Sequence, residues 1–248
     1  MLETFKFFLY DFFMPQPLIF RMIDKAVYDY KMIEKNDRIL VGASGGKDST
    51  ALIEYFANRA RRPDCEFEFK ALHVSTEITK PLDGELERIF DSWGVKAEEK
   101  YVDVLGRIKE GHKMNCWWCS TQRRTELLNY AIENGFNKIA LGHHLDDILE
   151  TLLMNAVEHG NLATMPPRLK YKKFPVSIIR PLCYVPVARI KEHAENEGYA
   201  SVTCTCSYQA NSGRKDARKK LDVLTDGIDE KKQRLFQALR NIQPEYLP

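Results

Sequence analysis

The feature that most constrains the fold is a glycine turn that joins an apolar run to a helix start, Ile39-Leu-Val-Gly-Ala-Ser-Gly-Gly-Lys-Asp-Ser49. The run over residues 39–41 is apolar and partly β-branched, as a strand buried on both faces requires. The two adjacent glycines permit backbone conformations and close approaches that a Cβ would prevent. Asp48 or Ser49 can cap the helix that follows, whose unpaired N–H groups and positive dipole end attract anions. The segment therefore predicts a strand–turn–helix that binds phosphate.

Apolar runs alternate with amphipathic segments along the rest of the chain. Strands are predicted over residues 39–43, 69–74, 100–104, 138–141 and 176–179, and helices over 48–58, 84–93, 120–134, 147–158 and 188–197. This alternation predicts an α/β fold with a doubly wound, mostly parallel sheet, whose ligand crevice lies at the carboxyl ends of its strands. A helix over residues 17–31 precedes the sheet, and residues 214–239 form one or two basic helices after it.

Basic residues are clustered, although the formal net charge is only +2. Three groups stand out: Arg59, Arg61 and Arg62; Arg168, Lys170, Lys172 and Lys173; and Arg214, Lys215, Arg218, Lys219 and Lys220. Acidic residues collect elsewhere, around residues 83–99. This segregation favours a polyanionic partner on one face, whereas any single group can equally be a solvated helix or loop face.

The N-terminal stretch Phe5-Lys-Phe-Phe-Leu-Tyr-Asp-Phe-Phe13 is the most apolar part of the chain, but two charges interrupt it and prolines soon end it. It is too short to span a bilayer, and it lacks the basic leader and cleavage site of a signal peptide. We therefore expect an aromatic arm that packs on the body or on a second subunit of a homodimer, no membrane association, and a cytoplasmic protein. In that compartment the six cysteines are expected to serve metal or redox chemistry instead of disulfides.

A second polar motif, Gly142-His-His-Leu-Asp-Asp147, comes directly after the apolar run and before a helix. Paired carboxylates at a strand-to-helix turn are poor packing residues and good ligands of Mg²⁺, which prefers a few carboxylate oxygens together with phosphate oxygens and water. The alternative for Asp146 alone is that it caps the following helix. His73, at the end of the second strand, is predicted either to contact a nucleotide or to be a hydrogen-bonded core histidine.

A third motif, Cys116-Trp-Trp-Cys119, opens a helix with two arginines one turn on, and Cys204-Thr-Cys206 follows far downstream. Negative charge on thiolates is favoured near a helix N-terminus, which makes them better ligands and nucleophiles. Three interpretations compete: a thioredoxin-like redox pair, a structural zinc site on all four cysteines, and an iron–sulfur cluster on Cys116, Cys119 and one later cysteine. We favour the cluster, because three protein thiolates leave one iron open to hold a sulfide for transfer.

The contiguous Ser-Gly-Gly-Lys-Asp-Ser differs in spacing from the Walker A loop and resembles the signature of the PP-loop ATP pyrophosphatases, which split ATP between its α and β phosphates. Further motifs are Cys-x-x-Cys-Ser-x-x-Arg-Arg, Gly-His-His-x-Asp-Asp, Met165-Pro-Pro, Arg180-Pro-Leu and a late cysteine. With them, the chain from about residue 32 to about residue 209 resembles the tRNA 2-thiocytidine synthetase family. The resemblance implies the adenine nucleotide alpha hydrolase-like fold of PP-loop ATPases.

The family resemblance also implies an enzyme that uses ATP, Mg²⁺ and a 4Fe-4S cluster to thiolate a cytidine at position 32 of the tRNA anticodon loop. Carried over by position, the nucleotide-binding residues are Ala43, Ser44, Gly45, Gly46, Lys47, Asp48, Ser49, His73, Arg123, Gly142 and Asp147. Catalysis is assigned to Lys47, Asp48, Asp146 and Asp147, and cluster binding to Cys116 and Cys119. We favour Cys206 over Cys204 as the third ligand, because Gln209 follows it much as a glutamine follows the ligand in the family. The two late cysteines are one residue closer together here than in the family.

Such a reaction requires the C2 oxygen of cytosine to become a leaving group, which adenylation achieves before sulfur replaces it. Lys47 and a magnesium held by Asp147 or Asp146 are expected to offset charge on the pyrophosphate, and the open iron to deliver sulfide. Trp117 and Trp118 are predicted either to stack on an unstacked nucleotide or to pack in the core. The expected partners are tRNA and a sulfur donor such as a cysteine desulfurase.

We divide the chain into an aromatic arm and helix (1–34), a PP-loop ATPase domain with the iron–sulfur site (35–212) and basic C-terminal helices (213–248). Two other functions stay open. One is a related PP-loop enzyme that makes 2-thiouridine, although the cysteine-rich zinc modules of that group are absent from the sequence. The other is a non-catalytic sensor of ATP and the cluster, against which the intact Lys47 and the paired carboxylates argue.

Overall fold

The computed structural model describes residues 16–79, 81–109, 111, 113–200 and 213–246. Its strands form one six-stranded sheet in the order β3-β2-β1-β4-β6-β5. They are β1 (Arg38–Gly42), β2 (Glu68–Thr76), β3 (Glu98–Val102), β4 (Lys138–Ala140), β5 (Arg168–Lys170) and β6 (Ser177–Ile179). All neighbouring strands are parallel except the antiparallel pair β5 and β6. The prediction of a mostly parallel α/β sheet is confirmed.

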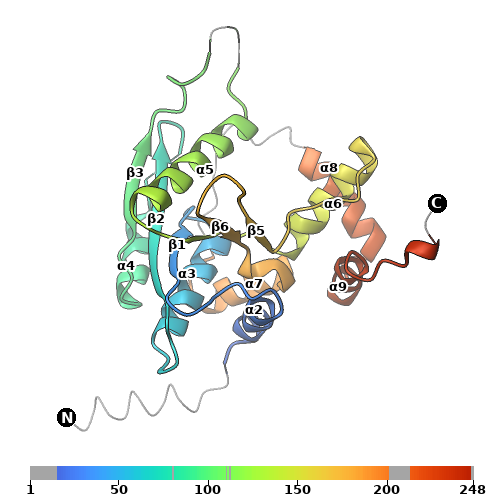
Figure 1. Cartoon of the computed structure of the whole chain (residues 1–248), viewed down its shortest axis with the longest axis horizontal. Helices are drawn as coiled ribbons and strands as arrows, with labels where there is room; N and C mark the ends of the chain where they lie inside the picture. Colours follow the sequence, from blue (N-terminus) through green and yellow to red (C-terminus); the bar gives the residue numbers. More distant parts are fainter. Residues whose placement is uncertain (1–15, 80, 110, 112, 201–212, 247–248) are drawn as a thin grey trace.

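Helices cover both faces of this sheet (Figure 1). They are α2 (Leu18–Asp29), α3 (Lys47–Ala60), α4 (Gly84–Ser92), α5 (Cys116–Glu133), α6 (Leu145–His159), α7 (Val187–Asn196), α8 (Gly213–Thr225) and α9 (Asp229–Ala238), with the 3-10 turns η1 (Pro181–Tyr184) and η3 (Pro244–Tyr246). One core cluster includes α2, α3, α4, α6 and α7, and α5 forms the second on the other face. Ile39 and Val41 of β1 enter the first cluster and Leu40 the second, which explains the continuous apolar run of this strand.

Two elements differ informatively from the sequence-based prediction. α5 begins at Cys116 in place of residue 120, because the Asn115 side chain caps the helix by accepting a hydrogen bond from Trp118 N at 2.9 Å. β5 has no counterpart in the prediction. Its three residues, two of them charged, are too few to show the alternation by which a strand is recognised.

The strand order places the topological switch point, where a ligand crevice is expected, between β1 and β4. The chain passes from β1 outward through β2 to β3 on one side, and β4 is followed outward by β6 on the other. Ligands of doubly wound sheets bind at the carboxyl ends of the strands at such a switch point. The loop over residues 43–46 follows β1 and the loop over residues 141–144 follows β4. Both predicted polar motifs therefore lie at the edge where a ligand is expected.

The segments on either side of the central sheet share its core. α2 contributes Ile19, Phe20 and Ile23 to the first cluster, and α9 contributes Phe236. α8 and α9 pack beside α6, at the right of the molecule in Figure 1. The domain boundaries after residues 34 and 212 stay predictions.

Several predictions concern residues outside the described part of the chain. The aromatic arm and its contacts with a second subunit involve residues 1–15, and the late cysteines Cys204 and Cys206 fall within residues 201–212. Among the described residues, none of the helices combines the length and apolarity needed to cross a bilayer.

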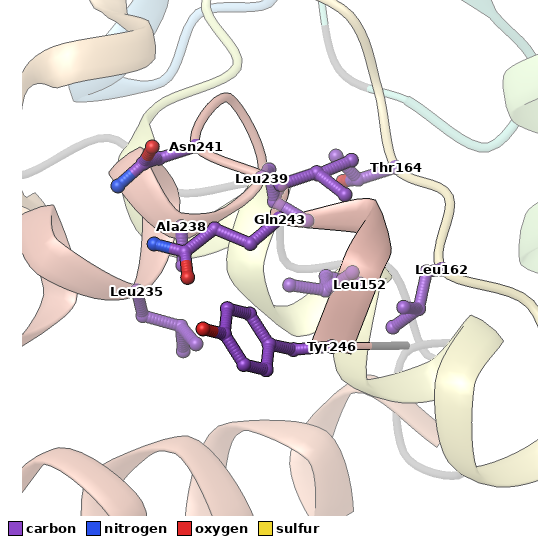
Figure 2. A pocket seen from close by; sticks show the side chains of 10 residues that line it. Leu152, Leu162, Thr164, Leu235, Ala238, Leu239, Asn241, Gln243 and Tyr246 are labelled. Atoms are coloured by element: carbon purple, nitrogen blue, oxygen red, sulfur yellow. The ribbon is translucent and has the colours of Figure 1, made fainter. Parts of the chain in front are cut away.

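An apolar cavity of about 510 Å³ lies between α6, α9 and η3 (Figure 2). Its walls include Leu152, Leu235, Leu239 and Tyr246, and none of the described residues that line it is charged. The cavity lies along the middle of α6 and not at its N-terminus, where the crevice between β1 and β4 opens. Among the described residues that line it, no cationic side chain is available to bind a nucleotide phosphate.

Candidate functional site

The loop after β1 is held in shape by its own serines. The Ser44 and Ser49 hydroxyls lie 2.9 Å apart, Ser44 N donates to Ser49 Oγ at 3.1 Å, and Ser49 Oγ donates to Gly46 O at 2.9 Å. Gly45 adopts a φ of +78°, a left-handed conformation that is inexpensive only for glycine. These contacts form a tight cradle ahead of α3.

The N-terminus of α3 carries no capping side chain. The helix begins at Lys47, and its N-cap is Gly46 in an extended conformation (φ −94°, ψ 157°). The prediction that Asp48 or Ser49 caps the helix is wrong, because Ser49 bonds within the loop and Asp48 accepts a hydrogen bond from Lys47 Nζ at 2.8 Å. The first N–H groups of a helix have no intrahelical acceptor, so this end can donate to an anion.

The loop after β4 touches the start of α3. A Cβ added to Gly142 would lie 3.1 Å from Ser49 N and 3.2 Å from Asp48 C. Both neighbours are backbone atoms of a helix, which cannot move aside as a flexible side chain can. The two motifs approach this closely because residue 142 is a glycine. The structure thus brings together Gly142, Asp48 and Ser49, three of the predicted nucleotide-site residues.

His144 and Asp147 cap α6 reciprocally. His144 Nδ1 accepts a hydrogen bond from Asp147 N at 3.3 Å, and Asp147 Oδ2 accepts one from His144 N at 3.2 Å. The second carboxylate oxygen, Asp147 Oδ1, lies 3.8 Å from Arg214 Nη1 of α8. The Asp147 side chain is 15% exposed. One of its oxygens therefore already faces a cation at the rim of the crevice.

Asp146 is buried in the body of the protein. Its Oδ1 accepts a hydrogen bond from Lys232 Nζ of α9 at 2.7 Å, and its Oδ2 accepts one from Val187 N of α7 at 2.7 Å. Burial raises the pKa of Asp146, but the hydrogen bonds outweigh burial, and the net pKa is below the ordinary value. Both oxygens serve to pack α7 and α9 on α6. The assignment of Asp146 as a magnesium ligand or catalytic residue stays a prediction, whereas the alternative that Asp146 caps the helix is wrong, because His144 is the N-cap.

The two adjacent carboxylates should respond differently when their charge is removed. In Asp146→Asn the buried Lys232 ammonium loses its counter-charge, and we expect the free energy of unfolding to fall by about 3–5 kcal/mol. In Asp147→Asn we expect a loss of only about 1 kcal/mol from the weakened cap. If the thiolation expected from the family resemblance is the activity, its rate should fall by about 10²–10³-fold. Urea unfolding and single-turnover assays measure the two effects, and equal losses of stability would contradict this division.

α5 presents two thiols in its first turn. Cys116 is its first residue and is half-buried, and Cys119 is 6% exposed. Residues three apart on a helix lie on the same face, and the positive end of the helix dipole stabilises negative charge there. Because α5 runs antiparallel to the strand that follows it, its first turn lies at the same edge of the sheet as the loops after β1 and β4.

The two neighbouring tryptophans have different surroundings. Trp118 packs against the second core cluster, and its Nε1 donates to Val104 O at 3.2 Å. Trp117 is 69% exposed. Core packing therefore accounts for Trp118, whereas Trp117 is accessible to a ligand beside the thiols.

A model of the family described as the PP-loop domain matches residues 17–221. The tRNA-cytidine(32) 2-sulfurtransferase of Alkalilimnicola ehrlichii is 35% identical over 237 residues, which cover 94% of this chain and 75% of the relative. The chain belongs to the PP-loop tRNA-cytidine 2-sulfurtransferase family. The family predicted from the three motifs is confirmed.

Solved structures agree with the PP-loop assignment. The U34-tRNA thiolase NcsA from Methanococcus maripaludis with its 4Fe-4S cluster is similar with a TM-score of 0.72 and 25% identity, covering 91% of this chain and 78% of that chain. The NMN synthetase from Francisella tularensis has a TM-score of 0.53 at 12% identity, covering 93% of this chain and 98% of that one, and shows the fold alone. The PP-loop ATPase fold expected from the sequence is confirmed.

The crevice of this PP-loop protein fits a nucleotide. Four buried nitrogens at this edge have no hydrogen-bond partner among the described residues: His73 Nε2, Arg123 Nε, His143 Nδ1 and Arg180 Nε. His73 is fixed by its other ring nitrogen, Nδ1, which lies 2.7 Å from Ala43 O. The predicted contact of His73 with a nucleotide stays a prediction. Buried polar atoms are normally paired. Together with the uncapped end of α3, His73 Nε2 and Arg123 Nε form a set that a phosphorylated ligand can satisfy.

The described cysteines fit an iron–sulfur cluster. Cys116 and Cys119 supply two soft sulfur ligands one helical turn apart. Iron–sulfur clusters are held by cysteine thiolates. The thioredoxin-like interpretation requires a thioredoxin βαβ unit beside the cysteine pair, whereas this pair opens a helix of a PP-loop fold. The predicted third ligand, Cys206 or the alternative Cys204, falls outside the described residues.

Only one of the three basic groups lies directly at the site. Arg59, Arg61 and Arg62 end α3 at the opposite edge of the sheet, where Arg62 pairs with Asp24. Arg168 lies on β5 and pairs with Glu34 at 3.1 Å. The group on α8 includes Arg214 beside Asp147. The sequence gives no signal for this last contact, because α8 reaches α6 only through the tertiary fold.

Proposed function

We propose that this protein converts a cytidine of tRNA, at position 32, to 2-thiocytidine in a reaction that depends on ATP and an iron–sulfur cluster. The observation that carries the proposal is the meeting of three parts at one edge of the sheet. These parts are the uncapped end of α3, the Asp147 loop after β4 and the thiols that open α5. The activity is that for which the relative of 35% identity is named.

The chain's own groups divide the handling of the nucleotide among them. N–H groups at the start of α3 bind phosphate oxygens. Lys47 Nζ, which donates a hydrogen bond to Asp48 Oδ1 in this structure, offsets the charge that develops on the pyrophosphate. Asp147 Oδ1 is the ligand we assign to Mg²⁺, in place of its present neighbour Arg214. ATP, when bound, supplies the adenylyl group that makes the C2 oxygen a leaving group. Arg123 and His73 contact the nucleotide through the nitrogens that have no partner among the described residues.

Sulfur transfer is assigned to the α5 end of the crevice. Cys116, Cys119 and Cys206 hold the cluster, with Cys204 as the alternative third ligand. A cluster on three thiolates supplies, when bound, an iron that can carry sulfide. The exposed Trp117 offers a stacking face to the target base once that base has left the anticodon-loop stack.

The partners follow from this chemistry. The substrate is tRNA, and a protein such as a cysteine desulfurase donates the sulfur. We place the reaction in the cytoplasm. The homodimer predicted from the aromatic arm stays a prediction.

A tRNA uridine thiolase is the second candidate, because NcsA, which is similar in structure, is named a U34-tRNA thiolase. A sensor that binds ATP without splitting it is disfavoured by Lys47 at the cradle and by Asp147 at the rim. Conversion of ATP to AMP and pyrophosphate in a single turnover with tRNA separates an enzyme from a sensor.

The decisive experiment is nucleoside mass spectrometry of tRNA from cells that lack the gene. The cells are complemented with the wild type, Cys206→Ala, Cys204→Ala or the control Cys65→Ala, whose thiol donates to Phe67 O in a loop away from the site. We expect 2-thiocytidine with the wild type and the control, and none with Cys206→Ala. Loss of a thiouridine in the deletion would transfer the chemistry to the second candidate. If no thionucleoside changes, the proposed function is wrong.

A further inference from the structure

Arg180 is a buried cation that has no counter-ion among the residues that the structure describes. It follows β6 directly, and the residue is only 7% exposed. Its Nη1 donates to Pro166 O at 2.6 Å, whereas its Nε is buried without a hydrogen-bond partner among the described residues. Within the described part of the chain, no carboxylate forms an ion pair with this guanidinium. The family resemblance and the nucleotide assignment leave Arg180 without a role.

Other buried charges of the described chain are paired. Lys138 Nζ lies 2.5 Å from Asp37 Oδ2, and Lys232 Nζ lies 2.7 Å from Asp146 Oδ1. The buried Glu150 carboxylate accepts from Arg218 at 2.7 Å. An uncompensated buried charge costs several kcal/mol. Because these other charges are paired and Arg180 is not, an anionic ligand that binds at Arg180 would supply the missing counter-charge.

The immediate surroundings of Arg180 are also positive. Burial, together with the nearby charge of Arg124, lowers the pKa of Arg180 to about 10. Burial, and the charges of Arg180, Arg214 and Arg124, lower the pKa of His143 to about 4, against the opposing effect of Asp147. The imidazole of His143 is therefore neutral at pH 7, and its buried Nδ1 has no partner among the described residues. Guanidinium and imidazole groups of this kind are donors suited to phosphate oxygens.

The position of Arg180 favours RNA over ATP as the source of the phosphate. The phosphate cradle follows β1, whereas Arg180 follows β6, with β4 between the two strands. On the other side of β6 is the hairpin with β5, where Lys170, Lys172 and Lys173 are exposed. Lys170 lies opposite Ser177, three residues before Arg180, and Lys172 and Lys173 lie in the turn at the amino end of β6. The exposed basic group therefore runs along the hairpin away from Arg180, and such basic surfaces track nucleic-acid backbones.

We propose that Arg180, with Arg124 and His143 beside it, binds a backbone phosphate of the RNA next to the target nucleotide. The inference rests on the proposed function, because it requires an RNA substrate. It adds to that function a second phosphate site, separate from the one at α3. This site would hold the RNA backbone at the crevice while the base is presented to the nucleotide.

The test compares Arg180→Met with Arg88→Met, an exposed arginine on α4 at the far side of the sheet, in the cluster-loaded protein. We measure binding of unmodified tRNA over a range of salt concentrations. In Arg180→Met we expect the tRNA affinity to fall about tenfold, and the slope of log affinity against log salt to decrease by about 1. Arg180→Lys keeps the positive charge, so we expect it to keep most of the salt dependence of tRNA binding. Affinity for a non-hydrolysable ATP analogue stays at the wild-type value in all three variants.

The other outcomes of this test would contradict either the phosphate site at Arg180 or the proposed function. An unchanged tRNA affinity and slope in Arg180→Met would overturn the proposal, and so would a loss of analogue binding with tRNA binding intact, which would make ATP the ligand. If Arg180→Met does not fold, the exposed Arg124→Met decides, because the proposal requires it to weaken tRNA binding in the same direction. If the salt slope falls as expected but the wild type forms no 2-thiocytidine, the phosphate site stands and the proposed function fails.

Discussion

Gly142→Ala is expected to abolish productive ATP binding, whereas Gly84→Ala leaves it intact. The added Cβ at residue 142 would lie 3.1 Å from Ser49 N, so the loop after β4 must move away from the start of α3. That movement separates Asp147 from the phosphate cradle. A misplacement of about 1 Å can cost about 10²-fold in rate, and we expect at least that loss in thiolation.

Gly84 provides a matched control, because a Cβ added there meets no atom within 4 Å. It is the first residue of α4, and alanine is a better helix former than glycine. Titration with a fluorescent ATP analogue and single-turnover conversion of ATP to AMP measure the effects, and thermal unfolding checks that both variants are folded. Wild-type affinity in Gly142→Ala would show that the two loops do not act as one site.

The parts of the site that could be predicted from sequence are those built by local chain geometry. The turn at Gly45 and Gly46 follows from residues that tolerate its backbone conformation, and its place after a strand follows from the apolar run before it. The Cys116 pair at a helix start is likewise local. The alternation of strands and helices also predicts that the glycine turn and the cysteine pair lie at the same edge of the sheet, because parallel strands place their carboxyl ends together.

The parts that could not be predicted depend on contacts between distant segments. Asp146 and Asp147 are adjacent and chemically identical, yet Lys232 of α9 takes the first and Arg214 of α8 faces the second. The sequence places both lysine and arginine in C-terminal helices without indicating where those helices pack. The sequence shows Arg180 as part of a motif but not as an unpaired charge, since the lack of a counter-ion among the described residues becomes visible only when its neighbours are placed.

Cys119→Ser is expected to remove the cluster and all thiolation while ATP binding persists. A hydroxyl is a poor ligand for cluster iron compared with a thiolate, so the purified variant should lose its iron and its visible absorption. The cradle for ATP is formed by residues 44–49 after β1, and the substitution does not touch it. Because Cys119 is 6% exposed, burying the new hydroxyl costs about 1–3 kcal/mol of stability, and the half-buried Cys116→Ser serves as the milder companion.

Cys65→Ser is the control, because Cys65 is half-buried in the loop between α3 and β2, away from the site. It should keep the wild-type iron content and activity. Anaerobic metal analysis, ATP-analogue titration and nucleoside mass spectrometry give the three readouts. Zinc in place of iron in the wild type would favour the structural zinc interpretation. Iron and 2-thiocytidine retained in both Cys116→Ser and Cys119→Ser would exclude this pair as ligands. Iron lost with thiolation retained would show that sulfur reaches the tRNA without a cluster, leaving α5 a role in binding alone.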